Sequence, residues 1–207
     1  MLALLKELFD KEELLAARFG IEREALRVTK LGKLAMTSHP AVFGNKLEHP
    51  YITTDFSESQ IELITPSFES AKETYQFLNA LYDMTALNIG EEILWPQSMP
   101  CDIPEDEQIP IARYADCEKC LEARKYREAL LKKYGGKKQL ISGVHYNFSF
   151  EGNILSKLYE KTQGAKSFTD YKNAMYLKVV RNYLRYRWLL IYLTGASPVF
   201  HKSFATT

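Results

Sequence analysis

Residues 51–66 read Y-I-T-T-D-F-S-E-S-Q-I-E-L-I-T-P, and this stretch decides how the rest of the chain is interpreted. Its β-branched and aromatic residues are typical of a strand, and Pro66 ends the pattern. Three carboxylates nevertheless lie within it, namely Asp55, Glu58 and Glu62. Acidic residues are unfavourable in strands and costly to bury without a partner. The stretch therefore predicts a strand whose carboxylates bind cations.

Two further stretches predict strands with a polar face. In residues 21–28, I-E-R-E-A-L-R-V, the alternation of side chains along a strand places Glu22 and Glu24 on the same face. Residues 139–150 alternate cleanly and carry His145. Oxygen-rich ligand sets suit Mg²⁺ or Mn²⁺ better than zinc, and carboxylates on several strands imply more than one ion. Clustered Mg²⁺ is typical of phosphoryl transfer from ATP.

Simpler interpretations of these residues stay open at this level. Glu22 and Glu24 could face solvent on an edge strand, and His145 could be a hydrogen-bonded histidine of the core. The sequence contains no phosphate loop of the G-x-x-x-x-G-K-[ST] type. If ATP binds, metal ions must therefore hold its phosphates.

Helices are expected around these strands. The last of them ends in W-L-L-I-Y-L, which is apolar on all sides and is therefore expected to be buried. Ser67 is the expected N-cap of the second helix. We see no internal repeat and no domain boundary within residues 1–207. Apolar periodicity indicates helices over residues 2–18, 68–88, 114–133 and 169–193.

The composition of the 207 residues is that of an ordinary soluble protein, with 46% hydrophobic and 26% charged residues. A net charge of +1 gives no reason to expect nucleic-acid or membrane binding. The charges are unevenly placed, because residues 1–110 hold 9 basic and 19 acidic residues and residues 111–207 hold the other 18 and 7. Such halves could hold a metal beside a nucleotide, or could simply attract each other.

The three cysteines predict a reducing, cytoplasmic compartment, because their number is odd in a chain of this length. Cys117 and Cys120 form a C-x-x-C pair, and Cys101 is the only other thiol, so a four-ligand zinc site is not expected. The first residues lack the apolar region and cleavage site of a signal peptide. No apolar run approaches the roughly 20 residues that span a bilayer.

Several long motifs, in order over about residues 18–204, resemble the bacterial type of glutamate–cysteine ligase, or γ-glutamylcysteine synthetase. The start H-P-Y-I-T-T-D and the end L-R-Y-R-W-L-L-I-Y-L-T-G-A-S-P are most similar to the N-terminal module of bifunctional glutathione-synthesising enzymes. The resemblance implies an α+β fold like that of glutamine synthetase. In that fold a curved antiparallel sheet forms a half-barrel, here incomplete, with helices packed outside. The other motifs are G-I-E-R-E-A-L-R-V, L-W-P-Q-S-M-P and I-S-G-V-H-Y-N-F-S.

The activity implied by the resemblance is the first step of glutathione biosynthesis. ATP, with Mg²⁺ or Mn²⁺, phosphorylates the γ-carboxylate of glutamate, and the amine of cysteine then attacks the γ-glutamyl phosphate. Members of the family run on for about as many residues again, and that part supplies further strands and much of the ATP site. We therefore expect residues 1–207 to be the N-terminal part of the catalytic domain and to be inactive alone. The expected partners are the missing C-terminal half and a glutathione synthetase domain.

The resemblance also assigns residues to a site. Ile141 matches a glutamate contact, and Arg127 is a candidate catalytic contact for an anion. Glu58 has no clear counterpart and is expected at the surface. The pocket for the cysteine side chain matches Phe56, Tyr126, Leu130 and Gln139. The metal ligands match Glu22, Glu24, Asp55, Glu62 and His145.

Two alternatives to this ligase remain. The chain could be a remnant that no longer catalyses and acts as a binding or assembly module. It could also be part of a related carboxylate–amine ligase with another amine acceptor, because only part of the acceptor pocket is visible.

Overall fold

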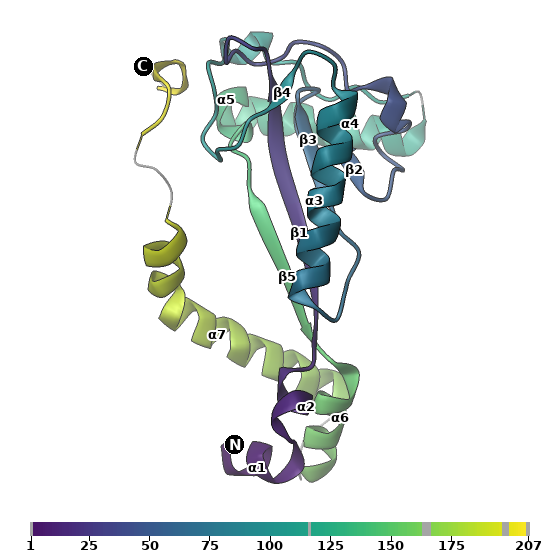
Figure 1. Ribbon diagram of the computed structural model, residues 1–207, viewed down its shortest axis with the longest axis vertical. Coiled ribbons are helices and arrows are strands. Elements are labelled where there is room, and N and C mark those ends of the chain that lie inside the picture. Colours follow the sequence, from purple (N-terminus) through teal and green to yellow (C-terminus); the bar gives the residue numbers. More distant parts are fainter. Residues whose placement is uncertain (1, 116, 163–166, 196–198, 206–207) are drawn as a thin grey trace. The chain divides into compact units, whose positions relative to one another are not determined.

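The computed structural model describes residues 2–115, 117–162, 167–195 and 199–205 (Figure 1). These residues form two compact units. The helical unit comprises residues 1–18 and 148–197, and the sheet unit comprises residues 19–147 and 198–207. All of the predicted site residues fall in the sheet unit.

An open sheet of five strands forms the centre of the sheet unit, with the order β2-β3-β1-β4 and with β5 also paired to β1. Strand β3 runs antiparallel to both β1 and β2, and β4 runs antiparallel to the end of β1. The mixed α and β content and the open antiparallel sheet confirm the coarse fold prediction. The strands are β1 (Ala17–Val28), β2 (Ile52–Thr54), β3 (Gln60–Ile64), β4 (Ile93–Leu94) and β5 (Val144–Phe150).

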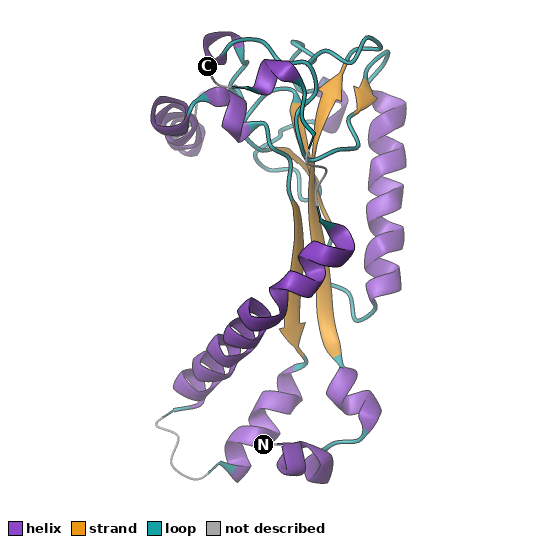
Figure 2. Ribbon diagram, turned by 90° about the vertical axis from the view of Figure 1, so that its left-hand side faces the viewer, coloured by secondary structure: helices purple, strands orange, loops and turns teal. Residues whose placement is uncertain are grey.

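Helix α3 (Ala71–Asn88) lies along one face of this sheet (Figure 2). Leu78 and Leu81 on α3 pack in one apolar cluster with β1 and β3 residues. The N-cap of α3 is Ser70, so the prediction of Ser67 was wrong. Phe68 is held extended by backbone hydrogen bonds to Phe19 in both directions, of 2.7 and 2.9 Å. This tertiary pairing delays the start of the helix.

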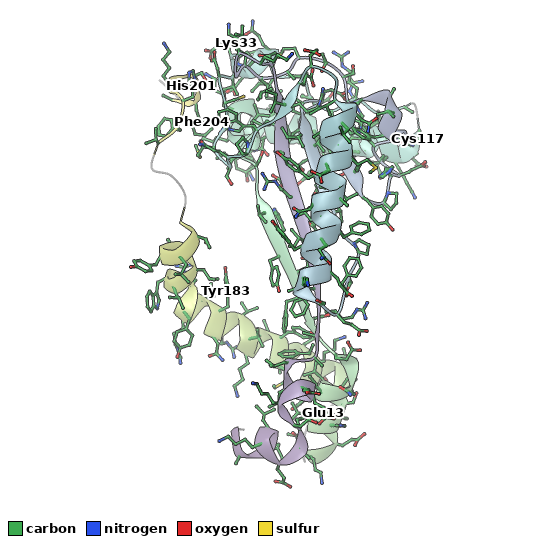
Figure 3. The ribbon with its side chains drawn as sticks, in the orientation of Figure 1. Glu13, Lys33, Cys117, Tyr183, His201 and Phe204 are labelled. Carbon is green, nitrogen blue, oxygen red and sulfur yellow. A yellow bond between two sulfur atoms is a disulfide. The ribbon has the colours of Figure 1, made fainter. Side chains whose placement is uncertain are left out.

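A second apolar cluster lies beside helices α4 (Glu118–Tyr134) and α5 (Gly136–Gln139). Its buried members include Leu26, Phe56 and Leu140. Cys117, labelled in Figure 3, caps α4 and forms a disulfide with Cys120. Cys101 is a buried free thiol. Short 3₁₀ turns complete the unit at Ala41–Phe43, Asp106–Gln108 and Lys202–Phe204.

The helical unit corrects the prediction of one helix over residues 2–18. The structure instead has α1 (Leu2–Leu8) and α2 (Lys11–Leu15), because Asp10 and Glu13 form a reciprocal capping box. The chain then enters β1 at Ala17. Helices α6 (Gly152–Lys161) and α7 (Phe168–Thr194) complete the unit.

The apolar end of α7 is exposed, so the prediction that it is buried was wrong. Trp188 is 62% exposed and Tyr192 is 81% exposed. Among the described residues, the apolar cluster of the helical unit includes α7 residues of the first turns only, Tyr171 and Met175. Figure 3 shows the side chain of Tyr183, farther along α7, projecting from the helix. No described helix is both long and apolar enough to cross a membrane.

Candidate functional site

Strand pairing brings the predicted carboxylates to neighbouring positions. Glu22 and Glu24 lie on β1, and Glu62 on β3 is the register partner of Glu24. Asp55 lies between β2 and β3. Because β1 is paired on both of its edges, the interpretation of Glu22 and Glu24 as residues of a free edge strand is wrong.

The imidazole of His145 on β5 faces the β1 carboxylates. Its Nε2 lies 3.4 Å from Glu24 Oε1, and its Nδ1 lies 3.9 Å from Glu22 Oε2. The His145 side chain is 56% exposed, so it is not a core histidine. In the described part of the chain, no other cationic group lies within 4.0 Å of these two carboxylates. The Asn147 side chain donates a 2.8 Å hydrogen bond to Glu22.

Gly143 makes room for this arrangement. Its backbone N–H donates a 2.8 Å hydrogen bond to Glu24 Oε2. A Cβ atom at residue 143 would lie 2.8 Å from Nε2 of His145. Any larger residue would therefore displace the imidazole from the carboxylates.

Electrostatics at the cluster favour a bound cation or proton. The pKa values of Glu24, Asp55 and Glu62 are all raised, chiefly because burial disfavours the charged form. Repulsion from Asp55 adds to the rise for both glutamates. Among the described residues, no three His, Cys, Asp or Glu side chains are yet gathered closely enough to hold a metal ion. The cluster has the oxygen ligands that hard cations prefer. Because these side chains are not close enough together, they would have to move toward one another to share an ion.

The predicted cysteine pocket is brought together in part. Phe56 is 2% exposed, and Leu130 of α4 packs against the same apolar cluster. Tyr126 lies one helical turn before Leu130 and is 63% exposed. Gln139 ends α5. Ile141, the predicted glutamate contact, is 42% exposed.

Gln60 is a residue of this region that the sequence interpretation missed. It is fully buried on β3. Its Oε1 accepts a 3.3 Å hydrogen bond from the Phe56 N–H, and its Nε2 lies 3.5 Å from Glu24 Oε2. Gln60 therefore connects the carboxylate cluster to the pocket wall. Its alternation with Glu62 along the strand was the available sequence signal.

Glu58 is only 2% exposed, so the prediction of a surface position was wrong. Its carboxylate accepts a 2.7 Å hydrogen bond from the His39 N–H, and it is also bonded to the Arg113 N–H and to the Lys46 ammonium. Burial raises the pKa of Glu58, but these donors outweigh burial and the net pKa is lowered. The charge is buried because three donors from two loops converge on it.

His39, in the same network, predicts a pH dependence of stability. Burial, aided by the Lys46 and Arg27 cations, lowers its pKa to about 4. As pH falls, His39 is therefore protonated in the unfolded chain before it is protonated in the folded one. We expect the free energy of unfolding to fall between about pH 6.5 and 4, by at most about 1.4 kcal/mol per pH unit. Urea unfolding at several pH values measures the slope. His39→Gln should reduce it and the exposed-site control His201→Gln should not; equal slopes in all three proteins contradict the assignment.

Arg127 lies on α4 with its guanidinium against the backbone of residues 54 and 55. It donates to the carbonyls of Asp55 and Thr54, the latter at 3.3 Å, and to Ala123 at 3.0 Å. The predicted catalytic residue therefore touches the chain segment that carries Asp55 and Phe56.

Comparison with known proteins identifies the family. The sequence profile described as Glutamate-cysteine ligase matches residues 2–207. The chain belongs to the glutamate–cysteine ligase family. It is 50% identical over 195 residues to the glutathione biosynthesis bifunctional protein GshAB of Listeria monocytogenes, covering 94% of this chain and 25% of that protein. It is 45% identical over 199 residues to the glutamate–cysteine ligase of Clostridium acetobutylicum, covering 96% of this chain and 41% of that ligase.

Two solved structures have the same fold as this chain. A bifunctional glutathione synthetase from Pasteurella multocida superposes with a TM-score of 0.86 at 39% identity, over 96% of this chain and 26% of that one. A glutamate–cysteine ligase from Francisella tularensis in complex with AMP superposes with a TM-score of 0.85 at 38% identity. The match covers 93% of this chain and 37% of that one. The chain thus spans about a quarter of its bifunctional relatives and about two fifths of the single ligases.

Proposed function

We propose that this chain forms the N-terminal part of a ligase that joins the γ-carboxylate of glutamate to the amine of cysteine at the expense of ATP. The observation that carries the proposal is the cluster of Glu24, Asp55 and Glu62, whose pKa values are raised, beside His145 in a chain of this family. Burial disfavours the charge of these half-buried carboxylates, and either a bound cation or a proton would compensate it. In a reaction of phosphates, Mg²⁺ meets that need.

Five side chains would hold Mg²⁺ or Mn²⁺ at this site. Hard cations prefer such oxygen ligands, and the one imidazole is compatible with Mn²⁺. When bound, the ions would neutralise negative charge on the ATP phosphates and on the glutamate carboxylate. Gly143 and Asn147 would orient this set, through their hydrogen bonds to Glu24 and Glu22. The five side chains are those of Glu22, Glu24, Asp55, Glu62 and His145.

The cysteine side chain would lie against the wall formed by α4 and the segment after Asp55. Apolar surfaces with one phenolic hydroxyl suit a small thiol-bearing side chain. Phe56 and Leu130 supply the apolar wall, and Tyr126 and Gln139 supply polar groups. Ile141, at the head of the same segment as His145, would contact glutamate.

The sheet, the nucleotide and the partner domains can be assigned on the same grounds. The open sheet would be one part of a glutamine synthetase-like half-barrel that the rest of the ligase domain extends. ATP would be the nucleotide, in keeping with the AMP complex of the Francisella tularensis relative. The remaining ligase region and a glutathione synthetase domain would be its partners, and the cytoplasm would be its compartment.

A chimaera tests the proposal. Residues 1–207 replace the matching region of the Clostridium acetobutylicum ligase, to which they are 45% identical. We expect this chimaera to release ADP and form γ-glutamylcysteine from glutamate, cysteine, ATP and Mg²⁺, because this chain supplies the predicted metal ligands and pocket. Mass spectrometry identifies the product, and omission of cysteine is the control. A folded, nucleotide-binding chimaera that forms no product contradicts the proposal, and a preference for another amine points to a different acceptor.

A further inference from the structure

The segment between β2 and β3 connects the two halves of the proposed site. Asp55 supplies a carboxylate to the metal cluster, and the next residue, Phe56, walls the cysteine pocket. The segment is bonded on its β3 side by Asp55 N–H to the Gln60 carbonyl at 3.3 Å. On the opposite side of the segment, the Ala112 N–H donates a 2.9 Å hydrogen bond to the Phe56 carbonyl. What fixes the carbonyls of Thr54 and Asp55 then decides how the Asp55 and Phe56 side chains point.

Arg127 fixes those carbonyls. Its Nε and Nη2 donate to Asp55 and Thr54, and its Nη1 donates to Ala123 in its own helix. A guanidinium presents its donors in a rigid planar fork, so one side chain can hold two successive carbonyls in a fixed relation. Arg127 therefore attaches α4, which carries Tyr126 and Leu130, to the segment that carries Asp55 and Phe56.

Tyr114 holds Arg127 in turn. The guanidinium carbon lies 5.0 Å from the centre of the Tyr114 ring, and the Lys46 ammonium lies 5.6 Å from the same centre. A cation over an aromatic ring is attracted more strongly when the pair is shielded from water. The Tyr114 hydroxyl is buried and has no hydrogen-bond partner among the described residues. The ring, and not the hydroxyl, makes the contact with Arg127.

We propose that Tyr114 is a positioning residue of the ligase site, whose ring holds Arg127 against the carbonyls of Thr54 and Asp55. The relation of this clamp to metal and cysteine rests on the function proposed above, but the clamp itself does not. Loss of the ring would free the guanidinium, and the Asp55–Phe56 segment would then sample other orientations. Loss of the hydroxyl alone would change little, since the hydroxyl has no bond to lose.

Hydrogen exchange of the 207-residue chain, followed by mass spectrometry, tests the clamp directly. In Tyr114→Leu and in Arg127→Lys, we expect amides of residues 54–58 to exchange roughly tenfold faster, with α3 amides unchanged. Arg127→Lys keeps the charge and removes the fork, so it remains informative if Tyr114→Leu does not fold. Tyr114→Phe should match the wild type. Tyr82→Leu is the matched control. The guanidinium carbon of Arg23 lies 5.5 Å from the centre of the Tyr82 ring, and this pair is not part of the Asp55–Phe56 segment.

Mn²⁺ affinity, measured by calorimetry on the same proteins, separates positioning from mere packing. We expect roughly tenfold weaker binding in Tyr114→Leu and Arg127→Lys, with the wild-type value in Tyr114→Phe and Tyr82→Leu. Unchanged exchange in both clamp variants, or equal effects of Tyr114→Phe and Tyr114→Leu, overturns the clamp. Faster exchange with unchanged Mn²⁺ affinity overturns its positioning role. If the wild type binds no Mn²⁺, the proposed metal site is contradicted. The hydrogen-exchange result still tests whether Tyr114 holds Arg127 in place.

Discussion

Replacing Glu24 with glutamine is expected to weaken Mn²⁺ binding on the order of 100-fold or more, while leaving the metal-free protein as stable as before or more stable. Loss of a residue that only supports a ligand already costs 10–100-fold in metal affinity, so loss of a proposed ligand should cost at least as much. The stability effect has the opposite sign because burial raises the pKa of Glu24, which means that its charge is unfavourable in the folded state. Glutamine keeps an oxygen that can accept the Gly143 N–H.

Calorimetric Mn²⁺ titration and thermal unfolding, with and without Mn²⁺, measure the two effects. Glu91→Gln is the matched control, because Glu91 is an exposed carboxylate whose partner, Lys30, is also exposed. We expect the control to keep both the ion affinity and the increase in Tm on adding Mn²⁺. A Glu24→Gln protein that is less stable without metal and binds Mn²⁺ like the wild type would make Glu24 a structural residue.

Replacing Arg27 with methionine is expected to lower the free energy of unfolding by about 3–5 kcal/mol. The Arg27 guanidinium is buried, with a side-chain exposure of 2%, and it forms an ion pair with Glu92. It also donates hydrogen bonds of 2.7–3.0 Å to Thr37, Ser38 and the Glu58 carbonyl. Methionine fills similar space but leaves these acceptors and the Glu92 charge without their donor.

Urea unfolding of Arg27→Met, compared with Lys30→Met, checks this expectation. Lys30 pairs with Glu91, the neighbour of Glu92 in sequence, but both of its ion-pair atoms lie at the surface. Exposed ion pairs contribute only about 0–1 kcal/mol, so Lys30→Met should change stability little. A similar small effect in both variants would mean that burial adds nothing to the Arg27 network.

Periodicity predicted the strands well where one face is polar and the other is apolar. The alternation predicted over residues 139–150 became β5 only from Val144, because Gln139 ends α5 and residues 140–143 are not strand. The alternation around Glu62 became β3. The sequence pattern predicted the structure wrongly where contacts with residues far away in the chain decide it. Phe68 is held extended by Phe19, so α3 begins after Ser70, and the apolar end of α7 has no described neighbour to bury it.

The sequence by itself determined the family, the alternation that puts Glu22 and Glu24 on one face, and the residue types of the proposed magnesium site, because these depend on residue identity and spacing alone. Only the tertiary structure decided that Glu62 pairs with Glu24, that Glu58 is buried, and that Tyr114 lies beneath Arg127. Each of these depends on contacts between residues far apart in the chain. Burial and pairing, not residue type, set the charge state of such carboxylates.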